Sequence, residues 1–152
     1  MDIFSGLLDG FSIALSGTNI LFAFLGALIG TAIGVLPGLG PAATIALLLP
    51  LTYVIASPVT AIIMMAGIFY GSMYGGSTTS ILLNLPGEAA SVVTCLDGYQ
   101  MARRGRAGVA LGVSAIGSFF AGTLGVVGLS LVAPSLAYFA LKFGPPEYSS
   151  LI

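Results

Sequence analysis

The most constraining feature of this sequence is a run of 78 residues, Gly10 to Gly87, that contains no Asp, Glu, Lys or Arg. A second uncharged run covers the 35 residues from 107 to 141. Charged residues make up 6% of the chain, against about 25% in a soluble domain. Water cannot solvate stretches of this kind, which are typical of segments in a lipid bilayer. We therefore predict an all-α fold, a polytopic membrane helix bundle.

The composition excludes several classes of function. The formal net charge is −1, and the three arginines within residues 103–106 are too few for a nucleic-acid-binding surface, so we expect no nucleic-acid partner. Histidine is absent and Cys95 is the only cysteine, which leaves no Cys/His metal site and no histidine-based catalytic triad. No lysine precedes Lys142 to activate a serine nucleophile. We expect neither an enzyme nor a bound cofactor.

Apolar stretches separated by Pro and Gly divide the chain into predicted helices. Residues 3–13 place apolar side chains on one helical face, which predicts an interfacial helix lying on the bilayer. Residues 88–106 hold five of the nine charged residues and predict a cytoplasmic segment. The predicted membrane helices are residues 20–36, 42–56, 58–74 and 107–133. All of residues 1–152 form a single transmembrane domain in this prediction.

Two Pro/Gly-rich segments interrupt the predicted helices. Pro37 cannot donate a backbone hydrogen bond and glycines follow it, so we expect a break there and a new helix from Pro41. Two glycines and four hydroxyl residues occupy positions 75–80, and Pro86 lies shortly beyond them. We predict irregular backbone at residues 75–80, as in a broken or re-entrant helix inside the membrane, with an extramembrane loop as the alternative.

Glycines also recur every four residues at three places in the chain. Small residues at this spacing form a stripe along a helix and let two helix backbones approach closely in a membrane. We therefore expect tight helix packing along these stripes, which are Gly26, Gly30 and Gly34, then Gly67, Gly71 and Gly75, and finally Gly108 and Gly112.

The two breaks are also where a polar ligand is expected. Residues 38–43 match a G-x-G-x-x-A dinucleotide fingerprint, but the next acidic residue is Glu88, so we reject that interpretation. A helix that begins at Pro41 still directs unpaired N–H groups at an anion. At the second break, hydroxyls and amides can bind an anion through donors or a cation through oxygens. The predicted substrate-binding residues are Gly38, Leu39, Gly40, Gly75, Gly76, Ser77, Thr78, Thr79 and Asn84.

Glu88 follows the second break and has two interpretations. Its carboxylate can bind a proton or a cation, or it can complement the dipole at the start of a helix. We favour the second interpretation, because an acidic residue in the first turn of a helix is common.

Three segments carry a family resemblance: residues 34–41 (GVLPGLGP), residues 74–88 (YGGSTTSILLNLPGE) and residues 97–102 (DGYQMA). Together they resemble the large membrane subunit of the tripartite tricarboxylate transporters, the TctA family. The resemblance implies a multi-pass secondary transporter of the bacterial inner membrane that imports tricarboxylates or related carboxylates by symport with Na⁺ or H⁺. It also implies two partners, a periplasmic solute-binding protein and a small membrane subunit.

The resemblance further implies that the chain is the N-terminal portion of a longer transporter, half of an internally repeated fold. A carboxylate substrate needs positive charge, which no side chain supplies between residues 10 and 87, and a helix N-terminus contributes only about half a charge. We therefore expect a coupling cation bound by Ser77, Thr78 and Thr79. The alternative function is a non-transporting membrane scaffold or assembly subunit, which leaves the run of hydroxyl residues unexplained.

Overall fold

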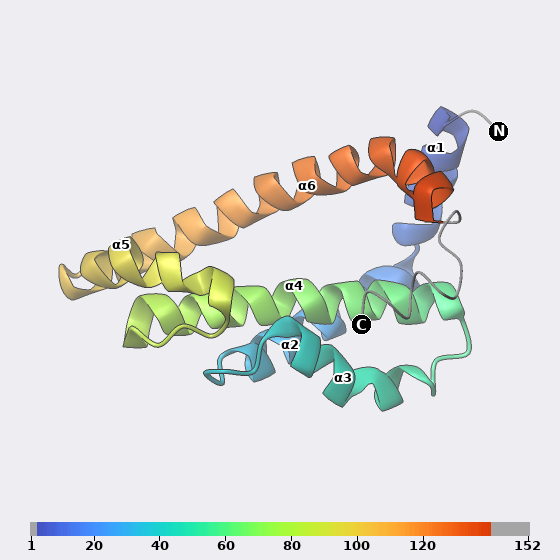
Figure 1. Cartoon of the computed structure of the whole chain (residues 1–152). Helices are drawn as coiled ribbons and strands as arrows, with labels where there is room; N and C mark the ends of the chain where they lie inside the picture. The colour runs from blue at the N-terminus through green and yellow to red at the C-terminus, as the bar shows by residue number, and fades with distance from the viewer. Residues whose placement is uncertain (1–2, 141–152) are drawn as a thin grey trace, which may run out of the picture. The chain divides into compact units, whose positions relative to one another are not determined.

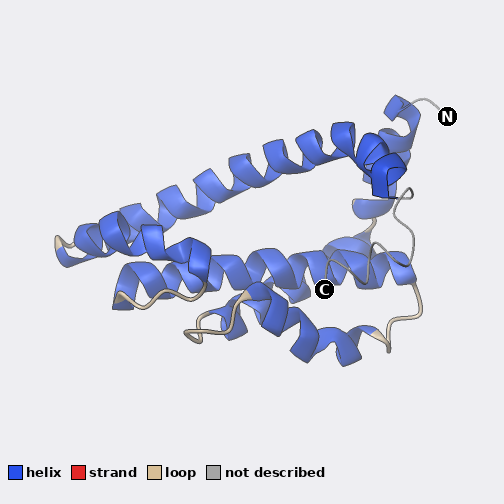
Figure 2. Cartoon of the chain, in the orientation of Figure 1, coloured by secondary structure: helices blue, strands red, loops and turns tan. Residues whose placement is uncertain are grey.

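The computed structural model describes residues 3–140, which are almost entirely helical, with no strand in this part of the chain (Figures 1 and 2). The chain divides into two compact units, residues 1–114 and residues 115–152. The described part of the second unit is the continuation of one helix, α6 (Ala107–Ala140). The predicted all-α membrane fold is confirmed, because α2, α4 and residues 107–133 of α6 are each long and apolar enough to cross a bilayer.

The first unit contains the remaining helices. They are α1 (Ile3–Ala14), α2 (Gly17–Gly34), α3 (Pro41–Thr52), α4 (Pro58–Leu83), the short 3₁₀ helix η1 (Ala89–Ser91) and α5 (Val92–Arg103). Helix α3 is apolar but shorter than a membrane span, and it ends before the predicted residue 56. Helix α6 continues past residue 133, where the prediction ended it.

Helix α4 corrects one prediction. It runs without interruption to Leu83, so the irregular backbone predicted at residues 75–80 is wrong. The hydroxyls of Thr78 and Ser80 donate to the carbonyls four residues earlier, at 2.9 Å in both cases, which satisfies these side chains inside the helix. Glycine and hydroxyl residues are typical of loops in water, but a helix that satisfies its own polar groups is favoured in a membrane.

Helices α2 and α4 pack in parallel along their glycines. A Cβ atom at Gly30 would lie 2.8 Å from the Ile68 Cα, and a Cβ at Gly67 would lie 2.5 Å from the Ala23 carbonyl oxygen. Only glycine permits such an approach of two backbones. The facing pairs keep one offset along both helices, so α2 and α4 run in the same direction: Gly26 with Met64, Gly30 with Ile68, and Gly34 with Ser72. The packing predicted for these two stripes is confirmed.

The third glycine stripe does not pack in this way. No described atom lies within 4 Å of a Cβ built at Gly108 or Gly112. Among the described residues, no other helix approaches these two glycines closely enough to require glycine there.

The parallel arrangement requires the chain to return between α2 and α4. Helix α3 contributes about 18 Å of this return, from 12 residues at ~1.5 Å each, and residues 53–57 complete it. Helix α4 then begins with Pro58 in its first turn, where the Ser57 hydroxyl accepts a hydrogen bond from the Thr60 N–H at 3.4 Å. This route places the segment after α2 beside the second half of α4.

A buried polar pair ties the starts of α2 and α4 together. The Thr60 hydroxyl donates to the Asn19 side-chain oxygen at 2.7 Å, and the Asn19 amide donates to the Ile13 carbonyl of α1 at 2.8 Å. A hydrogen bond of this kind fixes the register of two helices in an apolar environment. The sequence did not single out this pair.

Candidate functional site

The two predicted breaks meet beside α4. The Thr79 hydroxyl donates to the Val35 carbonyl at 2.8 Å, which joins α4 to the segment after α2. A Cβ atom built at Gly40 would lie 3.7 Å from the Glu88 Cβ, which places the first break beside the residue that follows the second. Segments far apart in the sequence therefore lie close together, and we take this region as the candidate site.

The first break exposes the N-terminus of α3. Gly38 adopts a left-handed conformation with φ of +86° and is exposed, a turn that favours glycine. Leu39 and Gly40 are half-buried, and Gly40 is the N-cap residue of α3 with Pro41 behind it. No described side chain caps this helix, so its first-turn N–H groups stay available to an anion.

A pair of hydroxyls that the sequence did not single out holds the start of α3 on α4. The Thr44 and Ser72 hydroxyl oxygens are 3.1 Å apart and buried, and the Thr44 hydroxyl also donates to the Gly40 carbonyl at 3.1 Å. Both residues are isolated polar side chains in an uncharged apolar stretch. That isolation could have marked each residue as needing a buried polar partner, but it does not identify the partner.

Because α4 is continuous to Leu83, the second break lies at residues 84–87, where the chain turns back along α4. Asn84 ends the helix in a left-handed conformation, with φ of 58°, and is exposed. The chain then reverses until Gly87 packs directly on the backbone of Gly76, since a Cβ at Gly87 would lie 3.1 Å from the Gly76 carbonyl carbon. Gly76 precedes Leu83 by seven residues, so the chain retraces about 10 Å of α4. Asn84 thus terminates α4. Its position does not support the prediction that it binds the same ligand as Gly76.

Glu88 lies at the point where the retraced segment meets the first break. Its backbone N–H donates to the Ser91 hydroxyl at 3.1 Å, and its carbonyl accepts from the Ser91 N–H at 3.1 Å, which starts the short helix before α5. Burial raises the pKa of the Glu88 carboxyl above its usual range. Glu88 is therefore the N-cap residue of this short helix, and the interpretation that its carboxylate complements a helix dipole stays a prediction.

The predicted cation ligands Ser77, Thr78 and Thr79 do not converge. Consecutive residues of an α-helix point in directions about 100° apart. Thr78 donates to a carbonyl of its own helix, whereas Thr79 contacts the Val35 carbonyl of another segment and, at 3.2 Å, the Gly75 carbonyl. Gly75 itself is a packing residue, because a Cβ there would lie 2.5 Å from the Thr31 carbonyl oxygen. The oxygens around Thr79 are therefore the part of the predicted cation site that the fold brings together.

Comparison with known proteins identifies the family. Residues 20–152 match the profile of the tripartite tricarboxylate transporter TctA family. The chain belongs to the TctA family. This family consists of transporter components and not of enzymes, as the sequence predicted. The chain is also 60% identical over 152 residues to an uncharacterized 52.8 kDa protein of the TAR-I ttuC' 3' region of Agrobacterium vitis, covering all of this chain and 30% of the relative. No solved structure matches.

This TctA-family chain also has a groove, lined by residues outside the two breaks. A groove of about 550 Å³ lies among the start of α2, the end of α3 with the link after it, and the start of α4. Its lining is almost wholly apolar, with hydroxyls only at Thr18, Ser57 and Thr60. Such a surface does not favour a carboxylate, so the convergence of the two breaks is the candidate site.

Proposed function

We propose that this chain forms part of the membrane subunit of a secondary transporter that imports tricarboxylates or related carboxylates across the bacterial inner membrane. The observation that carries the proposal is the family match over residues 20–152, combined with the convergence of both breaks on α4. The family name describes a tripartite transporter, so the proposal includes a periplasmic solute-binding protein and a small membrane subunit as partners.

The first break suits a carboxylate group. The uncapped N-terminus of α3 presents N–H groups and a partial positive charge at Gly40, where a side chain would restrict access. Gly38, Leu39 and Gly40 therefore stay the proposed substrate contacts of this segment, whereas Gly76 is covered by the backbone of Gly87 and stays a prediction. Ser77, Thr78 and Asn84 stay predictions, since the structure brings none of them to Gly40.

The proposed coupling cation binds at Thr79, within α4. Sodium or a proton bound near Thr79 and the Val35 carbonyl would offset the negative charge of the substrate. A site that holds both ligands couples the movement of the cation to that of the substrate, because neither charge is favourable alone in an apolar environment.

The scaffold alternative is less well supported. It relied on glycine stripes that assemble partner proteins, but the stripes of α2 and α4 already pack against each other within the chain. Those glycines have no free face to offer a partner, so of the three stripes the scaffold alternative keeps the one at Gly108 and Gly112.

The proposal is tested by uptake of radiolabelled citrate and of a dicarboxylate in cells that produce a complete transporter carrying this chain with both partners. We expect uptake that requires the binding protein and is lost with Gly40→Leu while the protein stays in the membrane. Gly10→Leu is the matched control, since a Cβ at Gly10 would meet no described atom within 4 Å outside its own helix backbone. A correctly inserted complex that takes up neither carboxylate would refute the proposal.

A further inference from the structure

Helix α5 runs beside the end of α4 and in the same direction. Gly87, before α5, contacts Gly76, whereas Gly98, within α5, contacts Ile81, with a Cβ at Gly98 only 2.7 Å from the Ile81 Cγ1. The contact point on α4 thus advances towards its C-terminus as the chain proceeds along α5. Figure 1 shows α5 alongside this end of α4.

The first half of α5 therefore lies at the level of membrane-spanning α4. Val92 precedes Gly98 by six residues, about 9 Å of helix. Measured along α4, Val92 therefore lies towards the N-terminal side of Ile81, close to Gly76. The last turn of α4 carries Leu82 and Leu83, 44% and 59% exposed, which is favourable only if apolar surroundings extend to this level. The start of α5 is then at hydrocarbon depth.

The outward face of this first half is apolar. Val92, Val93 and Leu96 are 49%, 70% and 67% exposed, while Gly98 on the opposite face packs against α4. Measured along α4, these exposed side chains and the exposed Leu82 and Leu83 follow one another without a gap. Three large apolar side chains in water would be costly, at about 25 cal/mol per Å² of apolar surface.

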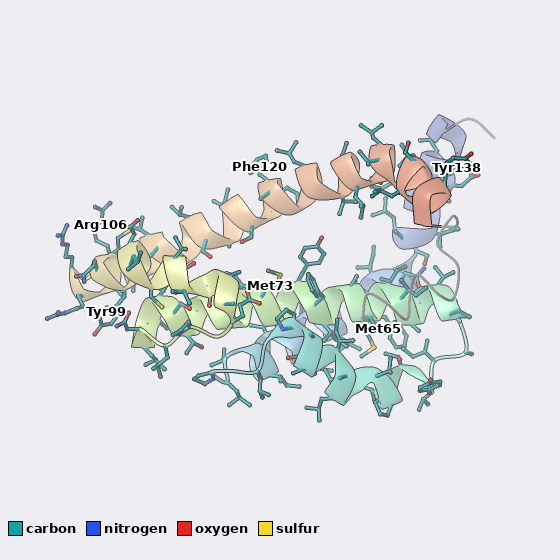
Figure 3. All side chains as sticks on the ribbon, viewed as in Figure 1. Met65, Met73, Tyr99, Arg106, Phe120 and Tyr138 are labelled. Carbon is teal, nitrogen blue, oxygen red and sulfur yellow. The ribbon has the colours of Figure 1, made fainter. Side chains whose placement is uncertain are left out.

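The end of α5 and the residues after it carry the positive charge. Arg103 follows Gly98 by five residues, about 7.5 Å, whereas Leu83 follows Ile81 by only about 3 Å, so the arginines lie beyond the end of α4. Arg103, Arg104 and Arg106 are all exposed, and Asp97 is the acidic residue of α5. Figure 3 shows Tyr99 and Arg106 at this end of the unit. Apolar residues at the level of the acyl chains and arginines at the level of the phosphates match the two layers of one leaflet.

We propose that α5 and the residues after it bind lipid, with Val92, Val93 and Leu96 against acyl chains and with Arg103, Arg104 and Arg106 on the phosphates of anionic phospholipid. The first half of the predicted cytoplasmic segment 88–106 then lies in the bilayer and only its second half reaches the cytoplasm. This surface is separate from the candidate transport site and does not depend on the substrate.

The absence of tryptophan from the chain allows a direct test. The full chain carrying Leu96→Trp is reconstituted in vesicles of phosphatidylcholine and phosphatidylglycerol, with bromine on the acyl chains of one lipid at a time. We expect blue-shifted emission and strong quenching, weaker in the comparison variant Gln100→Trp, which lies one turn nearer the arginines. Val93→Trp repeats the measurement if Leu96→Trp fails to fold.

The lipid headgroup is tested with the same fluorophore. Brominated phosphatidylglycerol should quench Leu96→Trp more strongly than brominated phosphatidylcholine, and the difference should disappear when the three arginines are replaced by Gln. Emission typical of water would overturn the proposal, and so would blue-shifted emission that neither lipid quenches, because protein would then cover the helix. Equal quenching by both lipids before replacement would overturn the role of the arginines.

Discussion

Gly87 lies directly on the backbone of Gly76, and the two glycines are not equivalent. A Cβ at Gly76 would be 3.4 Å from the Gly87 Cα, an ordinary contact, whereas a Cβ at Gly87 would overlap the Gly76 Cα. This contact sets how far the chain retraces α4 and hence where Glu88 and α5 begin.

The asymmetry predicts opposite effects for two similar substitutions. Gly76→Ala should leave stability unchanged or raise it by up to about 1 kcal/mol, because alanine favours the helix. Gly87→Ala should lower it by about 1–3 kcal/mol through overpacking against a backbone that cannot move aside. Thermal unfolding of both variants in detergent measures the difference. Equal stability of the two would show that the retraced segment does not pack as described.

The parallel packing of α2 and α4 gives the second prediction. Gly30→Ala should lower the free energy of unfolding by about 1–3 kcal/mol, since the new Cβ would lie 2.8 Å from the Ile68 Cα. Gly112→Ala is the matched control, because no described atom lies within 4 Å of that position. The control should be neutral or slightly stabilising. A neutral Gly30→Ala would contradict the direct contact of the two backbones.

The glycine stripes show what the sequence could and could not predict. Four-residue glycine spacing indicated close packing, because a stripe on a helix is a local property, but the spacing did not identify the partner helix. Pro37 and Pro86 located both breaks, since proline removes a backbone donor wherever it occurs.

The errors arose where tertiary context decided the outcome. Residues 75–80 have the composition of a loop, yet α4 continues through them because hydroxyl groups bond to their own helix and Gly75 packs against α2. The Thr44–Ser72 pair and the contact of Gly40 with Glu88 depend on the return of the chain through α3. No local pattern encodes such contacts.

Glu88 gives a prediction about pH. Burial raises the pKa of this carboxyl in the folded chain, so the neutral form is favoured by folding. The stabilisation is complete below the pKa of the unfolded chain and is lost as the pH rises through the higher folded pKa. Glu88→Gln should remove this pH dependence while keeping the cap, because an amide oxygen can still accept from the Ser91 N–H and the bonds made by the Glu88 backbone are unchanged. Unfolding temperatures of both proteins measured from acid to neutral pH check it, and an unchanged profile in the variant would assign the dependence to another group.

The arginines predict the orientation of the chain in the membrane. Arg103, Arg104 and Arg106 precede α6, and positive residues beside a membrane helix are retained on the cytoplasmic side. In a Cys95→Ser background, Arg104→Cys should react with an impermeant maleimide only after the cells are opened. Gly105 is unsuitable for the label because its φ of +75° strains any side chain. Labelling in intact cells would reverse the orientation and place both breaks on the periplasmic side.

The last prediction concerns coupling between the proposed cation and the substrate. If a cation near Thr79 offsets the charge of the carboxylate, each ligand must tighten the binding of the other by the same factor, about 5- to 150-fold for a typical coupling energy. Citrate affinity of the complete transporter, measured in sodium, in potassium and across pH, should therefore depend on one of these cations. Thr79→Val should weaken that dependence, because it removes the hydroxyl on the Val35 carbonyl, while Thr78→Val, which loses only a bond within its own helix, should preserve it. An affinity indifferent to sodium, potassium and pH would rule out the coupling cation, and a dependence lost with Thr78→Val and kept with Thr79→Val would move the site to the other face of α4.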